Sequence, residues 1–167
     1  MSSLRTRIHV DFVLAVVFTV LVPIVLLVRS ILNGALHYQI APFLTYWRAS
    51  SLLMVTVYSL IAQRPHAMVS GITARIAIAW SLLRFPYQND ALARWWVWLT
   101  VGYCLAGATV NIGQINDGAV RREYAAATQV YAQLFHRDHD VRLLGRVGDI
   151  GLMSWVIGAL ILRIKQS

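Results

Sequence analysis

An unbroken run of 17 apolar or weakly polar residues, Phe12–Val28, lies near the start of this chain of 167 residues. Extended to Leu32, the stretch is long enough at 1.5 Å per residue to cross a hydrocarbon core about 30 Å thick. Pro23 inside it predicts a kink. Arg5 and Arg7 precede the run as in a signal peptide, but the run is longer than a signal segment. We therefore interpret residues 12–32 as a retained first span.

Three further apolar segments, 43–62, 95–112 and 147–164, have the same character. Hydrophobic residues make up 58 % of the chain and charged residues 13 %, whereas a soluble domain has about 45–50 % and about 25 %. The sequence therefore predicts a single all-α integral membrane domain over residues 1–167, with four transmembrane helices or five.

The uncertain segment is 66–85, which is bracketed by Pro65 and Pro86. It is long enough to cross, but it would place Arg75 near its middle, at a cost of about 2.5–3.5 kcal/mol. It is either a tilted or re-entrant helix or a fifth span. The distribution of cations between the two sides does not separate these alternatives. The cost of a central arginine favours four spans, with both termini on one side.

The region 116–140 is the one substantial polar segment between spans, and we predict an amphipathic extramembrane helix there, introduced by the turn at 116–118. We expect this helix to lie on the membrane or against a partner. Its apolar face is predicted to contain Val120, Tyr124, Ala127, Tyr131, Leu134 and Phe135, and its opposite face Arg122, Ala125, Ala126, Gln129, Gln133 and His136.

The net charge of +8 comes from 14 arginines and one lysine against seven acidic residues. Arginines stand singly at the ends of apolar runs, which is typical of residues that set membrane topology; they are Arg29, Arg64, Arg84, Arg94 and Arg163. This distribution argues against nucleic acid as a partner. Cys104 is the only cysteine and lies within an apolar run, so we interpret it as a small buried hydrophobic residue.

Three charged residues inside or near the spans are candidate intramembrane contacts: Arg48, Arg75 and Asp149. In the four-span arrangement Arg48 and Asp149 lie at the same membrane face, where an ion pair between them is geometrically feasible. Charged groups in spans either hold helices together or mark a transport path. We favour the first interpretation, because a path needs a chain of such groups.

Gly145, Gly148 and Gly151 recur at every third position, with Ser154 and Gly158 following. This spacing predicts a groove on the last helix in which another helix packs closely. A carotenoid, a chlorophyll ring or a lipid is the alternative occupant.

The histidines offer few conventional ligand patterns. His136 and His139 stand in an H-x-D-H-D sequence that matches no established metal signature, so we predict no metal site. These two residues are the candidate ligands if the chain does bind a metal. His9, His37 and His66 lie near span ends, where a single imidazole is able to ligate a chlorophyll. The chain has no nucleophile elbow, HExxH motif or P-loop, and we do not expect an enzyme.

Several stretches resemble an uncharacterised membrane-protein family of cyanobacteria and plant chloroplasts, described as a domain of unknown function. The strongest matches are Asp11–Leu27 (DFVLAVVFTVLVPIVLL) and Thr45–Ile61 (TYWRASSLLMVTVYSLI). Fainter matches are Ala74–Ile76 and Leu144–Leu152 (LGRVGDIGL). The resemblance implies a location in the thylakoid or plasma membrane of a phototroph, and it supplies no reaction and no established site residues.

These observations together suggest a non-catalytic accessory subunit or assembly factor of a photosynthetic or respiratory membrane complex. Such a protein would act by packing against larger membrane subunits, with chlorophyll, carotenoid or membrane lipid filling gaps at the contact. A small transporter or channel that uses Arg48, Arg75 and Asp149 is the alternative. A membrane enzyme with a metal at His136–Asp140 is the third possibility.

Overall fold

The computed structural model describes residues 2–34, 36–84, 91–135 and 140–164. These residues form seven α-helices and one π-helix, and no strand occurs among them. The elements are α1 (Ser2–Val16), η1 (Val17–Leu21), α2 (Val22–Leu32), α3 (Leu36–Ile61), α4 (Ala67–Arg84), α5 (Ala91–Gly113), α6 (Gly118–Phe135) and α7 (Val141–Ile164).

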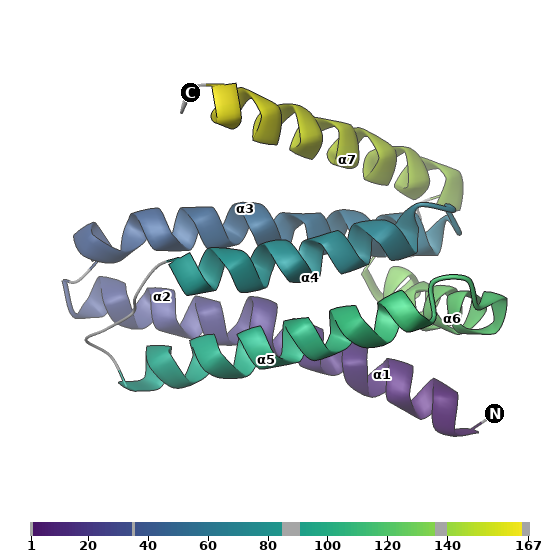
Figure 1. The fold of residues 1–167 in the computed structure, drawn as a ribbon, viewed down its shortest axis with the longest axis horizontal. Coiled ribbons are helices and arrows are strands. Elements are labelled where there is room, and N and C mark those ends of the chain that lie inside the picture. The colour runs from purple at the N-terminus through teal and green to yellow at the C-terminus, as the bar shows by residue number, and fades with distance from the viewer. Residues whose placement is uncertain (1, 35, 85–90, 136–139, 165–167) are drawn as a thin grey trace.

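The long helices lie side by side and alternate in direction along the chain (Figure 1). The helices α1, η1 and α2 form one interrupted rod, α3 packs against α4 and α7, and α4 packs against α5. The shorter α6 lies at the end of the bundle where the chain begins, and it contacts α1 and α3 (Figure 1). The last helix, α7, ends at the opposite end of the bundle from the start of α1 (Figure 1).

Four helical stretches among the described residues are long and apolar enough to cross a membrane: Leu4–Leu32, Ala67–Arg84, Ala91–Gly113 and Val141–Ile161. The fold is accordingly that of an all-α integral membrane protein. The uncertain segment 66–85 forms α4, which is one of the four and runs antiparallel to α3 and α5 (Figure 1). The expected span 43–62 lies in α3. That helix is long but contains several polar residues, and it is not among the four stretches found in the described chain.

The irregular turn in the first rod leaves two backbone carbonyls without a hydrogen-bond donor inside the helix. One of them belongs to Thr19, because Pro23 has no N–H to donate to it. The N–H of Val22 bonds to the carbonyl of Val17 instead of that of Phe18, which gives the π-helical turn η1. Side chains from two other helices bind the freed oxygens. The Tyr46 hydroxyl of α3 donates to the Thr19 carbonyl at 2.8 Å, and the Trp96 indole of α5 donates to the Phe18 carbonyl at 2.8 Å.

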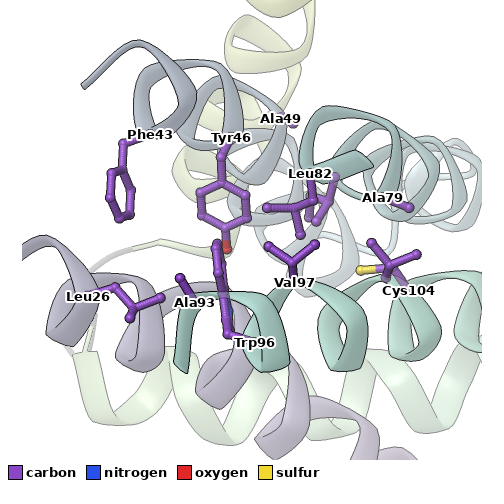
Figure 2. Packing of buried hydrophobic residues seen from close by; sticks show 12 residues of the cluster. Leu26, Phe43, Tyr46, Ala49, Ala79, Leu82, Ala93, Trp96, Val97 and Cys104 are labelled. Atoms are coloured by element: carbon purple, nitrogen blue, oxygen red, sulfur yellow. The ribbon is translucent and has the colours of Figure 1, made fainter. Parts of the chain in front are cut away.

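The two donors meet in the main hydrophobic core between α2, α3, α4 and α5. The Tyr46 and Trp96 rings pack edge to face with centroids 5.2 Å apart (Figure 2). Leu82 of α4 and Cys104 of α5 are almost fully buried in the same cluster. Cys104 therefore occupies the position of a small buried hydrophobic residue, as the sequence predicts.

Removing the Tyr46 hydroxyl with Tyr46→Phe is expected to lower the free energy of unfolding by about 1–3 kcal/mol, because it leaves the Thr19 carbonyl without its donor in an apolar interior. In a Pro23→Ala background residue 23 regains an N–H that can bond to Thr19, so the same substitution should cost less. Unfolding in mixed detergent micelles measures both values. Equal costs in the two backgrounds would show that the hydroxyl does not compensate for the proline.

Candidate functional site: a buried ion pair between α1 and α4

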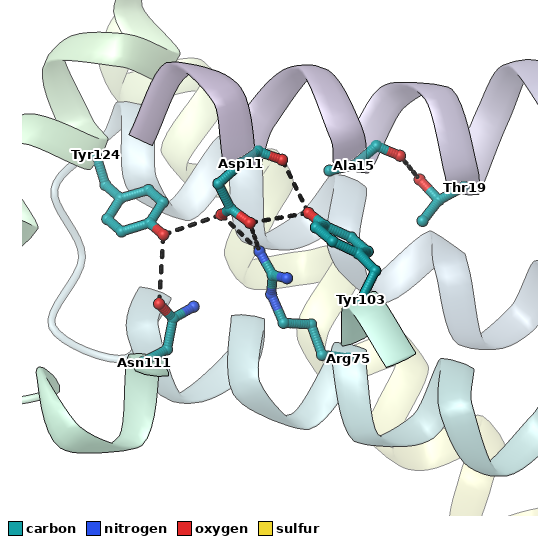
Figure 3. Close-up of polar contacts among 7 residues, drawn as sticks. All are labelled: Asp11, Ala15, Thr19, Arg75, Tyr103, Asn111 and Tyr124. Atoms are coloured by element: carbon teal, nitrogen blue, oxygen red, sulfur yellow. Dashed lines mark hydrogen bonds and ion pairs between the residues drawn. The ribbon is translucent and has the colours of Figure 1, made fainter. Parts of the chain in front are cut away.

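Asp11 of α1 and Arg75 of α4 form an ion pair in the interior of the bundle (Figure 3). Nη2 of Arg75 donates to both carboxylate oxygens of Asp11, at 2.7 Å to Oδ1 and 2.6 Å to Oδ2. The Arg75 side chain is 5 % exposed and that of Asp11 is 20 % exposed. The residues stand 64 positions apart in the sequence, so the pair joins two separate helices.

Two tyrosine hydroxyls complete the hydrogen bonding of the Asp11 carboxylate (Figure 3). The Tyr103 hydroxyl of α5 lies 2.9 Å from Oδ1 and 2.8 Å from the backbone carbonyl oxygen of Asp11. The Tyr124 hydroxyl of α6 lies 2.9 Å from Oδ2 and 3.3 Å from Oδ1 of Asn111. The carboxylate is thus held by side chains from α4, α5 and α6, which connects four helices through one anion.

The direction of the Arg75 side chain follows from helix geometry. Side chains of an α-helix lean toward its N-terminus, and α4 begins at the end of the bundle where α6 lies (Figure 1). Arg75 therefore extends from the middle of α4 toward that end and meets Asp11, which precedes the apolar run 12–28. This arrangement lowers the cost that a central arginine would otherwise carry, because the guanidinium is paired rather than isolated.

Gly107 of α5 makes room for the guanidinium. A Cβ atom at this position would overlap Nη1 of Arg75 and come within 2.7 Å of Cζ. On another side, Cζ of Arg75 lies 4.9 Å from the centroid of the Tyr103 ring, a cation–π contact. Nη1 itself is buried and has no hydrogen-bond partner among the described residues.

Tyr124 acts as a protonated donor in this cluster. Burial raises the pKa of its phenol above the ordinary tyrosine value, and the negative charge of Asp11 raises it further. The hydroxyl therefore keeps its proton at neutral and moderately alkaline pH and continues to donate to the carboxylate.

The sequence analysis identifies Arg75 as a candidate but not its partner Asp11. The signal available was charge balance. A buried arginine needs an acidic residue at similar depth, and the acids at or inside apolar runs are few. Asp11, directly before the first run, was a suitable one. The two tyrosines and Asn111 carry no sequence signal of their own, since each matches the composition of its helix.

Asp149 forms a separate cluster with the turn between α3 and α4, and its ion-pair partner is Arg64 rather than Arg48. Its Oδ2 lies 2.9 Å from Nη2 of Arg64, and its Oδ1 lies 3.4 Å from Nε2 of His66. These side chains are each more than a third exposed. The Arg48 side chain is exposed, and its backbone carbonyl accepts a hydrogen bond of 2.9 Å from the Trp155 indole of α7. Arg48, Arg75 and Asp149 therefore lie in three different surroundings.

The three closely spaced glycines of α7 face α3. A Cβ at Gly145 would lie 2.6 Å from that of Ala62, one at Gly148 would lie 3.1 Å from Ser59, and one at Gly151 would lie 2.8 Å from Val55. The groove predicted from their spacing thus holds a helix of the same chain, so the α3 side of these glycines leaves no room for a pigment ring.

Two of the histidine candidates have described side chains, and these two lie in different surroundings. His9 is exposed on α1 and His66 lies in the Asp149 cluster. His37 lies on the first turn of α3, and its side chain is outside the described part of the structure, as are His136 and His139. Asp140, the last residue of the H-x-D-H-D sequence, caps α7 by accepting a hydrogen bond of 3.0 Å from the Arg142 backbone N–H.

The predicted amphipathic helix is present as α6, but its buried face is rotated from the predicted one. Ala125, assigned to the polar face, is 4 % exposed, and Thr128 is fully buried. Because α6 packs on both α1 and α3, two of its faces are partly covered, whereas the prediction assumed a single flat contact. Asp117 caps its start with a bond of 2.8 Å from the Ala119 N–H.

Comparison with curated proteins and with solved structures finds no match to this chain. A comparison with family profiles matches residues 5–166, which include both residues of the ion pair, α4, α5 and α6 in full, and α1 from its fourth residue. The chain therefore belongs to the family described as "Protein of unknown function (DUF3177)".

Proposed function

We propose that this chain is a non-catalytic accessory subunit or assembly factor of a larger membrane protein complex, in a photosynthetic or respiratory membrane. The observation that carries the proposal is a second small-residue notch on α7 that no described part of the chain fills. A Cβ at Gly158 would meet nothing within 4 Å, and Ser154, four residues before it, is exposed. A pair of small residues at this spacing is a common site of close helix–helix contact in membranes.

Large apolar side chains flank the notch. Met153 is 68 % exposed, Ile157 is 56 % exposed and Leu160 is 55 % exposed. In the most apolar stretch of α7 only 17 % of the residues are buried, against 61 % in α4. A helix of a larger subunit is able to seat its ridge in the notch between these side chains, while lipid covers the rest of the surface.

The interior supports a structural role. The Asp11 carboxylate has its donors within the chain. Arg48, Arg75 and Asp149, which the alternative transport hypothesis would place along one path, each contact different residues. Carotenoid or chlorophyll, if present, would lie between α7 and its partner, outside the α3 contact of Gly145, Gly148 and Gly151. The resemblance to a family of phototrophs supports a thylakoid or plasma membrane as the location.

Purification from the native membrane in mild detergent tests this proposal. The wild-type protein is expected to co-purify with stoichiometric larger membrane subunits, and an absorption spectrum of the same sample reports pigment. Gly158→Leu fills the notch and should lose the partner. Gly102→Leu on α5 is the matched control, because a Cβ there also meets nothing within 4 Å. A colourless wild-type protein without partners, or equal loss in both variants, contradicts the proposal.

A further inference from the structure

A cavity of about 290 Å³ lies between the first turns of α1 and the middle of α6. Three polar side chains of α1, those of Arg5, Thr6 and His9, line one side, and Glu123 and Val130 of α6 line the other. Two alanines of α6 leave the space open between them. Both helices lie at the end of the bundle where the chain begins (Figure 1).

The depth of this cavity relative to a bilayer follows from the first rod. The 21 residues 12–32 span about 31 Å at 1.5 Å per residue, which fills the hydrocarbon core. Arg5, Thr6 and His9 come three to seven residues earlier on the same helix and so lie at the level of the lipid headgroups. A cavity at this level faces lipid headgroups rather than acyl chains or bulk water.

The residues that line the cavity offer a ligand both hydrogen-bond donors and a hydrogen-bond acceptor. The Arg5 guanidinium and a His9 ring N–H are donors suited to a phosphate group. The Glu123 carboxylate only accepts hydrogen bonds, so a ligand that fills the cavity must also present donors to it. Val13, one helical turn after His9 on the same face of α1, is 41 % exposed and leads from the cavity toward the hydrocarbon core.

We infer that this cavity binds the headgroup of an anionic glycerophospholipid whose headgroup carries hydroxyl groups. The phosphate lies against Arg5 and His9, a headgroup hydroxyl donates to Glu123, and an acyl chain follows α1 past Val13. The net charge of +8 favours an anionic lipid over a zwitterionic one. The inference does not depend on the partner proposed for α7, because the two sites lie on different helices.

Thermal unfolding of the full chain in neutral detergent, titrated with single lipids, tests this inference. The probes are phosphatidylglycerol, phosphatidylmethanol, which has the same charge but no headgroup hydroxyl, and phosphatidylcholine. The dependence of the unfolding midpoint on lipid concentration gives an apparent affinity for each variant, measured against that variant's own lipid-free midpoint. We expect phosphatidylglycerol to bind more tightly than phosphatidylmethanol, and both to bind more tightly than phosphatidylcholine.

Two variants and one control localise the binding. Arg5→Ala should weaken both anionic lipids about tenfold, the effect of losing one charged hydrogen bond. Glu123→Ala should remove the preference for phosphatidylglycerol over phosphatidylmethanol. Arg94→Ala, which removes an exposed arginine at the far end of the bundle, should change neither. Equal affinity for all three lipids, an equal effect of Arg5→Ala and Arg94→Ala, or an unchanged preference in Glu123→Ala would overturn the inference.

Discussion

Asp11→Asn is expected to lower the free energy of unfolding by about 3–5 kcal/mol, because it leaves the Arg75 guanidinium buried without a counter-ion. The substitution keeps the size of the side chain and an oxygen that can accept from Tyr103 or Tyr124. The loss therefore reports the charge rather than a cavity. Denaturation of the purified protein in mixed detergent micelles measures it.

A double variant separates the pair from its surroundings. In Asp11→Asn/Arg75→Met the buried charge is absent, so we expect stability much closer to that of the wild type than the sum of the single losses. Asp149→Asn is the matched control, since its ion pair with Arg64 is more than a third exposed and such pairs contribute about 0–1 kcal/mol. If Asp11→Asn costs no more than Asp149→Asn, the buried pair does not hold the bundle together.

Gly107→Ala is expected to be the most damaging single-methyl addition in α5. Its Cβ would overlap the Arg75 guanidinium, and moving that group breaks the hydrogen bonds to Asp11. The decrease in the free energy of unfolding should be larger than the typical cost of overpacking, which is about 1–3 kcal/mol. Gly102→Ala adds the same methyl to the same helix where nothing lies within 4 Å. It should leave stability unchanged or raise it by up to about 1 kcal/mol.

The shorter, uncharged side chain in Arg75→Met should make Gly107→Ala tolerable, because the atom that the new Cβ would meet is gone. Unfolding of all four combinations at positions 75 and 107 measures this coupling. An equal cost of Gly107→Ala with arginine and with methionine at position 75 would show that the glycine is required for another reason.

The sequence was sufficient to predict the helices that are determined by local patterns of residues. Runs of apolar residues predict the helices around 12–32, 95–112 and 147–164, and the Asn116–Gly118 turn predicts the start of α6. The packing role of Gly145, Gly148 and Gly151 also follows from spacing, because three glycines on one helix face allow close approach whichever helix is the neighbour.

Which charged residues pair depends on which helices are neighbours. The sequence alone does not identify those neighbours, so it does not predict the ion pairs. The preference for four spans over a fifth crossing at residues 66–85 counts Arg75 as an unpaired charge, whereas Arg75 pairs with Asp11 in the structure. Placing Arg48 and Asp149 at one membrane face suggested a pair that the structure does not contain. In both cases the energy of a charge was estimated without its actual partner, which is Asp11 of α1 for Arg75 and Arg64 of the turn after α3 for Asp149.

Proton flux through the chain in liposomes tests most directly whether the buried charges hold the bundle together or conduct. If the Asp11–Arg75 pair only holds the helices together, liposomes that contain the wild-type protein should show no proton flux above that of protein-free liposomes under the same pH gradient. Asp11→Asn should lower stability without changing the flux. A wild-type flux that disappears in folded Asp11→Asn protein would contradict this account and assign the pair to transport.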